Sequence, residues 1–258
     1  MEQTTLCGLY VEQIRRCLEY VDLILTISHS TKQDIAHYLD ISPDKIFVTP
    51  LASRYECAEA NNNPISSEDP ELSILKKISP KPYFLFTGTL EPRKNIPMLI
   101  RAFSALKSKY KVDHQLLLVG RKGWKYEPVF KAIEDSICAD EIHYLNYLSN
   151  QALMHLYQQA EAFIYPSYFE GFGLPVLEAM SLGCPVITSN TSSLPEVAGN
   201  AAILTSPTEM DELIDAMHKI IDSQGKRQTL ISLGYKQASK FSWQNTAYET
   251  LAAYRSIL

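Results

Sequence analysis

Short apolar runs alternate with helical patterns along most of this chain of 258 residues. Six runs after residue 82 are apolar almost throughout, which is typical of strands buried on both faces of a parallel sheet. Between them, apolar residues recur three or four positions apart, as in amphipathic helices. The pattern predicts an α/β fold, a parallel sheet with helices on both faces. Its strands are expected at residues 83–88, 115–120, 142–145, 162–166, 185–189 and 201–204, and its helices from Asn95 and at 128–138, 150–160, 175–182, 211–221 and 228–239.

The first 55 residues predict a smaller α/β unit. A helix is expected at 8–21, a strand at 23–28, a helix at 32–39 that Ser30 or Thr31 could cap, and a strand at 46–50. This order is the tail of an α/β layer rather than a whole domain. Residues 57–82 are rich in Asn, Ser and Pro, which indicates a surface linker with one short helix at about 70–78.

Composition and charge narrow the class of protein. The apolar fraction of 46% and the charged fraction of 21% are those of a soluble globular protein. A net charge of −5 disfavours a nucleic-acid groove, and without a run of about 18 apolar residues no transmembrane segment is expected. Charged residues throughout the first 25 positions argue against a signal peptide, so we expect a cytoplasmic protein, free or peripheral at the membrane. The cysteines and histidines are scattered, and no metal site is predicted.

The most informative stretch runs from Glu170 to Glu178, where two glutamates bracket a glycine-rich turn. A strand is predicted before it and a helix after it, an order that points backbone N–H groups and the positive end of a helix dipole at an anion. A carboxylate beside a phosphate is repulsive unless it accepts hydrogen bonds from hydroxyl groups. A nucleotide sugar carries both groups. The alternative, acids that only stabilise a helix N-terminus, suits Glu178 but not Glu170, which precedes the turn.

Two other loops follow predicted strands, and open parallel sheets bind ligands at the carboxyl ends of their strands. In the first loop, Arg93 and Lys94 could neutralise a diphosphate, the guanidinium as a fork and the ammonium as a point charge. A solvated basic pair is the commoner explanation for two such residues alone, and the glutamate turn favours the phosphate. In the second loop, Trp124 could stack on a base or cover the core. Residues 192–196 are interpreted as a plain turn that caps the next helix.

Three stretches carry a resemblance to a known family: residues 86–95 (FTGTLEPRKN), 169–180 (FEGFGLPVLEAM) and 193–199 (SLPEVAG). Together they resemble the retaining glycosyltransferases built from two Rossmann-like domains, the GT-B architecture (glycosyl transferases group 1, family 4). The resemblance covers roughly residues 20–258 and leans towards mannosyltransferase-like members. It implies a remnant of an amino-terminal acceptor domain (1–56), a linker (57–82), a nucleotide-sugar-binding Rossmann-like domain (83–240) and a carboxyl-terminal crossing helix (241–258).

The resemblance also implies roles for individual residues. Glu170 would contact hydroxyls of the sugar, and Glu178 those of the ribose. Arg93 and Lys94 would hold the diphosphate. The other implied donor-binding positions are Gly88, where the chain approaches the donor closely, the backbone of Phe172, Gly173 and Leu174 around sugar and phosphate, and a base pocket at Lys122, Tyr147 and Leu148.

The implied reaction moves a hexosyl group from a nucleotide-diphospho-sugar to a saccharide or lipid-linked acceptor with retention of configuration. The donor is GDP-mannose or a UDP-sugar, and no metal, cofactor or protein nucleophile is required. The positive charge of Arg93 and Lys94 would stabilise the leaving nucleoside diphosphate.

The chain departs from the family at its amino end. The glycine-rich first loop and the catalytic-site histidine of the acceptor domain have no counterpart. Either the gene is truncated or another chain supplies the acceptor domain, and exposed apolar surface on the remnant leads us to expect a homo-oligomer or a complex with that separate chain. A non-catalytic nucleotide-sugar-binding subunit stays open as an alternative, and a sugar-nucleotide epimerase would need acid and base residues that the sequence does not identify.

Overall fold

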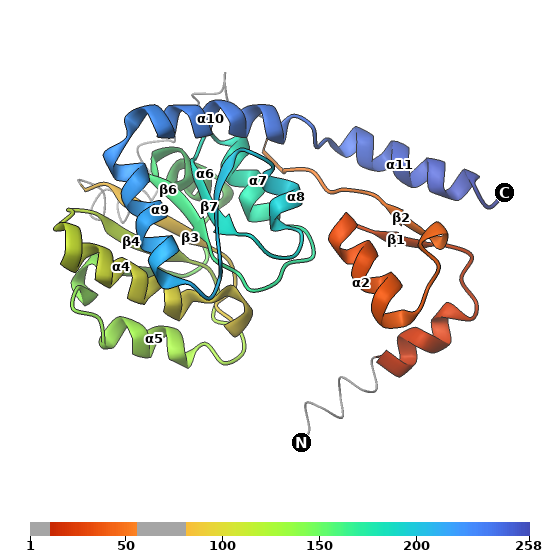
Figure 1. The fold of residues 1–258 in the computed structure, drawn as a ribbon, viewed down its shortest axis with the longest axis horizontal. Helices are drawn as coiled ribbons and strands as arrows, with labels where there is room; N and C mark the ends of the chain where they lie inside the picture. Colours follow the sequence, from red (N-terminus) through yellow and green to blue (C-terminus); the bar gives the residue numbers. More distant parts are fainter. Residues whose placement is uncertain (1–10, 56–80) are drawn as a thin grey trace.

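The computed structural model describes residues 11–55 and 81–258 (Figure 1). These residues form a six-stranded sheet and a separate two-stranded sheet, and every strand pair in both is parallel. The helix predicted at about 70–78 lies outside the described residues. Within the two described ranges, no helix is long and apolar enough to cross a membrane.

The six-stranded sheet confirms all six strands predicted after residue 82. Its order is β5-β4-β3-β6-β7-β8, and counted from β3 this is the 3-2-1-4-5-6 order of the dinucleotide-binding α/β fold. The direction in which the strands are added reverses between β3 and β6, and such a switch point is where these sheets bind ligands. The strands are β3 (Tyr83–Thr87), β4 (Gln115–Val119), β5 (Ile142–Leu145), β6 (Ala162–Tyr165), β7 (Val186–Ser189) and β8 (Ala202–Thr205).

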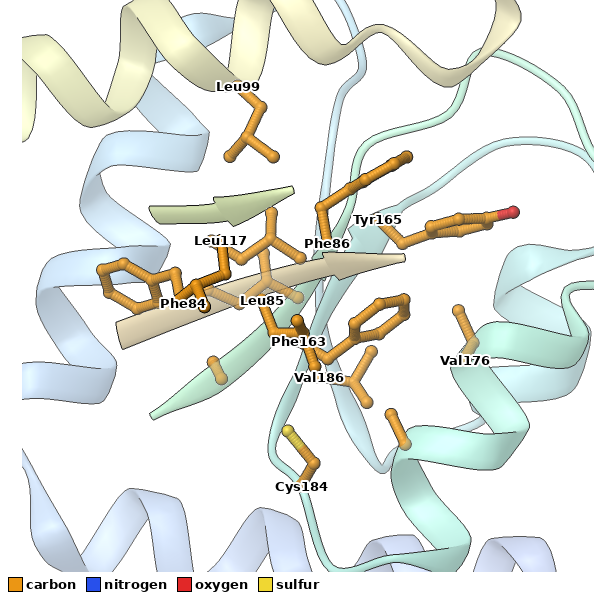
Figure 2. Packing of buried hydrophobic residues seen from close by; sticks show 14 of the residues in the cluster. Phe84, Leu85, Phe86, Leu99, Leu117, Phe163, Tyr165, Val176, Cys184 and Val186 are labelled. Carbon is orange, nitrogen blue, oxygen red and sulfur yellow. The ribbon is translucent and has the colours of Figure 1, made fainter. Parts of the chain in front are cut away.

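Helices cover both faces of this sheet and bury its side chains. Every residue of β3 and β4 is buried, which explains why these strands read as unbroken apolar runs. Figure 2 shows Leu99 on one face of the sheet and Val176 on the other. Burying a side chain of this size stabilises the fold by roughly 1.5–3 kcal/mol. Helices α4 (Ile96–Tyr110), α5 (Glu127–Glu134) and α9 (Met210–Asp222) pack together on one side, and α7 (Leu174–Ser181), α8 (Leu194–Ala198) and α10 (Gln224–Ala238) on the other; α6 (Asn150–Gln159) links β5 to β6.

The two-stranded sheet belongs to a small amino-terminal unit: β1 (Ile24–Thr26), α2 (His29–Leu39) and β2 (Ile46–Val48). The predicted cap of α2 at Ser30 or Thr31 is wrong. Ser28 is the cap, because its hydroxyl accepts a hydrogen bond from the N–H of Thr31 at 3.0 Å, so the helix begins three residues earlier than predicted. The preceding helix covers residues 11–18 of the described chain rather than reaching residue 21.

The last helix, α11 (Trp243–Arg255), leaves the large sheet and runs beside the amino-terminal unit (Figure 1). Ser242 caps it, and the hydroxyl of Thr246 donates to the carbonyl of Pro50 at 2.5 Å. Two helix ends differ from the prediction. Helix α5 stops at Glu134, because the Ser136 hydroxyl accepts the N–H of Cys138 in a local turn. Helix α10 starts at Gln224, four residues early, because Ser223 caps it.

Candidate functional site

The loop after β3 forms a 3-10 turn, η2 (Pro92–Lys94), that Asn95 fixes in place. The backbone of Asn95 is left-handed, with φ at 57°, a conformation that asparagine tolerates well. Its side-chain amide donates to the carbonyls of Pro166 at 3.2 Å and Pro207 at 2.8 Å. The amide therefore joins the loops that follow β3, β6 and β8 at one edge of the sheet.

Arg93 and Lys94 meet Glu170 at the switch point between β3 and β6. Lys94 Nζ lies 2.7 Å from Glu170 Oε1, and Arg93 Nη1 lies 2.6 Å from Glu170 Oε2. Arg93 also pairs with Glu91 at 2.7 Å and donates to the carbonyl of Phe169 at 2.7 Å. The structure therefore confirms that the basic pair and the first glutamate of the turn converge in one place.

Burial distinguishes the two cations. Lys94 is 7% exposed, whereas the side chain of Arg93 is 39% exposed. Burial lowers the pKa of Lys94 by more than the charge of Glu170 raises it. Burial also acts to raise the pKa of Glu170, but Lys94 and Arg93 together outweigh it, and the pKa of this carboxyl lies below its ordinary value. Glu170 is therefore ionised at neutral pH. Lys94 holds one oxygen of its carboxylate, and Arg93 holds the other.

A buried tyrosine completes this cluster. The Lys94 ammonium hydrogen-bonds to the hydroxyl of Tyr165, the last residue of β6, and lies 4.7 Å from its ring centroid. Burial raises the pKa of Tyr165 well above its ordinary value, and the negative charge of Glu170 adds to the rise. Tyr165 thus stays neutral and holds Lys94 against Glu170.

The glycine-rich turn is held by the hydroxyl of Ser193. This side chain is fully buried and is 2.8 Å from the carbonyls of both Glu170 and Phe172. Gly173 has φ at 113°, a backbone conformation that residues other than glycine rarely adopt, and it is the N-cap of α7. No hydrogen bond among the described residues uses the N–H of Gly173 or Leu174. Two donors and the positive end of a helix dipole are therefore available at the start of α7, in the turn that begins at Glu170.

Glu178 lies in a second cluster, on the first turns of α7. Its carboxylate accepts a hydrogen bond from Arg54 Nε at 2.6 Å, and the Arg54 Nη1 donates to Asn150 Oδ1 at 3.2 Å. The buried hydroxyl of Tyr157 lies near this carboxylate and is 2.6 Å from the hydroxyl of Thr87. Burial raises the pKa of Glu178, and the hydrogen bond and charge of Arg54 oppose that rise.

Lys122 and Tyr147, two of the three residues predicted for a base pocket, line a hollow of about 750 Å³ beside the ends of β4 and β5, and Leu148 is not among its lining residues. The guanidinium of Arg121 lies 5.0 Å from the ring centroid of Tyr147, which is 64% exposed. The ammonium of Lys122 turns towards the rings of Tyr126 and Phe130, at 4.9 and 4.4 Å. The hollow therefore combines two cationic side chains with the exposed ring of Tyr147. The residues that line it are Arg121, Lys122, Tyr144, Asn146 and Tyr147.

Two glycines bring this hollow next to the basic pair. A Cβ on Gly120 would lie 2.0 Å from the carbonyl oxygen of Gly88, so only glycine fits there. Gly88 itself has φ at 144°. Further along, the N–H of Leu90 donates to the carbonyl of Arg121 at 2.9 Å. The loops after β3 and β4 are therefore joined through their backbones.

Residues 68–237 match the family of glycosyl transferases group 1. This match covers more than half of the chain. The chain belongs to this family. Its parallel α/β sheet is thus that of a group 1 glycosyl transferase.

The chain is similar to two curated mannosyltransferases and to a solved structure with the same fold. The chain is 34% identical to the O-antigen chain mannosyltransferase B of Escherichia coli over 95% of its own length and 64% of the relative. It is 28% identical to the MMP alpha-(1->4)-mannosyltransferase of Mycolicibacterium hassiacum over 96% of its length and 57% of the relative. The solved sucrose-phosphate synthase of Thermosynechococcus elongatus shares the fold with a TM-score of 0.80, 21% identity, and coverage of 97% of this chain and 62% of that one. The chain thus spans less than two thirds of each.

Sequence reasoning found the central cluster of this group 1 member but missed several partners. Arg54 follows β2 and has no motif around it, so nothing in the sequence linked it to Glu178. The sequence predicts a plain turn at residues 192–196, yet Glu196 reaches across to α2, where its carboxylate accepts the N–H groups of His29 and Ser30 at 3.0 and 3.2 Å. Trp124 is 53% exposed, so the suggestion that it covers the core is wrong. Leu148 is partly buried against the core.

Proposed function

We propose that this chain forms the donor-binding half of a mannosyltransferase that uses GDP-mannose, with a UDP-sugar as the alternative donor. The observation that carries the proposal is the convergence of Arg93, Lys94 and Glu170 at the switch point, beside the N-terminus of α7. Such a site combines anion-binding donors with a carboxylate that can accept hydrogen bonds from hydroxyl groups. The names of the two mannosyltransferase relatives support mannose as the sugar.

In this proposal the two cations have different tasks. Arg93 is partly exposed, so it can turn from Glu91 towards a diphosphate. Lys94 is buried and keeps Glu170 ionised and in position beneath the sugar hydroxyls. The open N–H groups of Gly173 and Leu174 would add hydrogen bonds to the sugar or the phosphate. Ribose hydroxyls would bind Glu178, and the base would stack in the hollow beside Tyr147.

The proposed transfer retains configuration and needs no metal and no nucleophile from the protein. The bond between the anomeric carbon and the diphosphate oxygen breaks, and the acceptor hydroxyl attacks the same face of that carbon. The proton of the acceptor hydroxyl passes to the departing diphosphate. Arg93 and the N-terminus of α7 stabilise the negative charge that develops on the leaving group.

A thermal-shift panel of GDP-, UDP- and ADP-sugars tests the proposal. A ligand at 100 times its dissociation constant adds about 2.7 kcal/mol to the free energy of unfolding. We expect GDP-mannose and GDP to raise the melting temperature more than the other nucleotides do. An unchanged melting temperature with every nucleotide sugar would contradict the proposed function.

The second candidate function is a non-catalytic nucleotide-sugar-binding subunit whose acceptor site comes from a partner chain or a second copy. It is supported by exposed aromatic and aliphatic side chains on α11, at Trp243, Tyr248, Leu251 and Tyr254. Release of free mannose or transfer to a saccharide by this chain alone would favour the enzyme. Binding of the donor without turnover, together with a dimer or larger complex in light scattering, would favour the subunit.

A further inference from the structure

The Arg54 side chain joins Glu178 to the amino-terminal unit. Arg54 lies in the segment that follows β2, far from α7 in the sequence, and its Nε donates to Glu178 Oε1 at 2.6 Å. We propose that Arg54 is a positioning residue that orients the Glu178 carboxylate for the ribose hydroxyls of the donor. This inference rests on the proposed function, because it assigns a role within the same nucleotide-sugar site.

The contact differs from an ordinary surface ion pair in the burial of one partner. The side chain of Glu178 is only 5% exposed, whereas that of Arg54 is 51% exposed. A buried carboxylate is costly unless it is paired and hydrogen-bonded. Arg54 is the basic side chain that pairs with it among the described residues, so the charge of Glu178 depends on an arginine from another part of the fold.

The guanidinium is fixed at two points. While Nε binds Glu178 on α7, Nη1 donates to the side-chain oxygen of Asn150 at the start of α6. A planar fork held by two helices has one orientation, which a flexible ammonium group would not have. The carboxylate plane of Glu178 is thereby set before any ligand binds.

Recognition of a ribose depends on the charge and the orientation of the Glu178 carboxylate. Two neighbouring hydroxyls donate well to one carboxylate only if it is ionised and correctly turned. Burial favours the protonated form of Glu178, and Arg54 opposes this. Loss of Arg54 should therefore weaken the recognition of ribose hydroxyls specifically, while the diphosphate contacts at Arg93 remain.

Calorimetric titration with GDP and with 2′,3′-dideoxy-GDP separates these effects. We expect the wild-type chain to bind GDP roughly tenfold tighter, or more, than the dideoxy analogue. In Arg54→Ala this ratio should fall towards one through weaker GDP binding, with the affinity for the analogue unchanged. Arg54→Lys should restore part of the ratio, and Asn150→Ala, which frees one arm of the fork, should lower it less than Arg54→Ala does.

Arg101→Ala is the matched control, since it removes an exposed arginine on α4 away from this cluster, and it should keep the wild-type ratio. An unchanged ratio in Arg54→Ala, equal losses for both ligands, or tighter GDP binding would overturn the proposal. A wild-type chain that binds both nucleotides equally would overturn it as well. A wild-type chain that binds neither nucleotide would instead contradict the proposed function.

Discussion

Lys94 Nζ lies 2.7 Å from Glu170 Oε1, and each of these side chains is only 9% exposed. The pair bridges the loops after β3 and β6, so it spans the switch point of the sheet. Removing one partner of a buried pair leaves an unpaired charge, which typically costs about 3–5 kcal/mol. The pair therefore contributes to stability and to the geometry of the site at once.

We predict that Lys94→Met lowers the free energy of unfolding by up to about 3 kcal/mol, the lower end of this range, because Glu170 still keeps its ion pair with Arg93. Urea denaturation followed by circular dichroism measures this change. The double variant Lys94→Met/Glu170→Leu should recover much of the loss, since neither charge is then buried. A double-mutant cycle with additive effects would show that the two side chains do not interact.

Arg93→Ala should act on binding more than on stability, because its side chain is partly exposed. We predict that the variant binds GDP roughly tenfold to a hundredfold more weakly, the equivalent of one charge-assisted hydrogen bond. Isothermal titration calorimetry measures the affinity, with Arg101→Ala as a control for the loss of a positive charge. Wild-type affinity in Arg93→Ala would remove this residue from the diphosphate site.

The arrangement of the sheet could be predicted because its strands are apolar throughout. Such runs occur only where both faces are buried, and each is followed by a loop at the same edge of the sheet. This reasoning was enough to place Arg93, Lys94 and Glu170 together. Helix starts were less predictable, because the caps Ser28 and Ser223 each precede a polar first turn with no hydrophobic pattern to mark it.

Contacts between distant segments could not be predicted from local pattern. Arg54 and Glu178 are 124 positions apart, and Glu196 and His29 are 167 apart. Each contact depends on how the amino-terminal unit sits against α7 and α8, which hydrophobic periodicity does not encode. Ser193 was part of a recognised motif, but its role in holding the carbonyls of the glycine-rich turn needed the fold.

His114 should make the stability of the protein depend on pH. Its ring stacks on Phe84 with centroids 5.3 Å apart, and neither ring nitrogen has a hydrogen-bond partner among the described residues. Burial, with a smaller effect from Lys107 and Arg227, lowers the pKa of His114 from 6.5 to about 4. At a pH between these two values, the His114 imidazole is therefore protonated in the unfolded chain and neutral in the folded chain.

It follows that the contribution of His114 is fully present above about pH 6.5 and is lost as the pH falls towards 4. The full shift corresponds to roughly 3 kcal/mol. We predict that the free energy of unfolding of His114→Leu depends less on pH in this range than that of the wild type. The difference in this free energy between wild type and variant should change by up to roughly 3 kcal/mol between pH 7 and pH 4. Urea denaturation at several pH values gives both curves, and parallel curves would disprove the predicted titration.

Glu196 should hold the amino-terminal unit against the large sheet. Its carboxylate accepts the N–H groups of His29 and Ser30, two of the donors that the first turn of α2 leaves without a partner in the helix. We predict that Glu196→Ala destabilises the start of α2 by about 1–2 kcal/mol. Hydrogen exchange should then speed up at these two amides but not in β3 or β4. Glu134→Ala, at an exposed position in α5, is the control. Exchange that rises equally in both variants, or in neither, would show that Glu196 does not anchor α2.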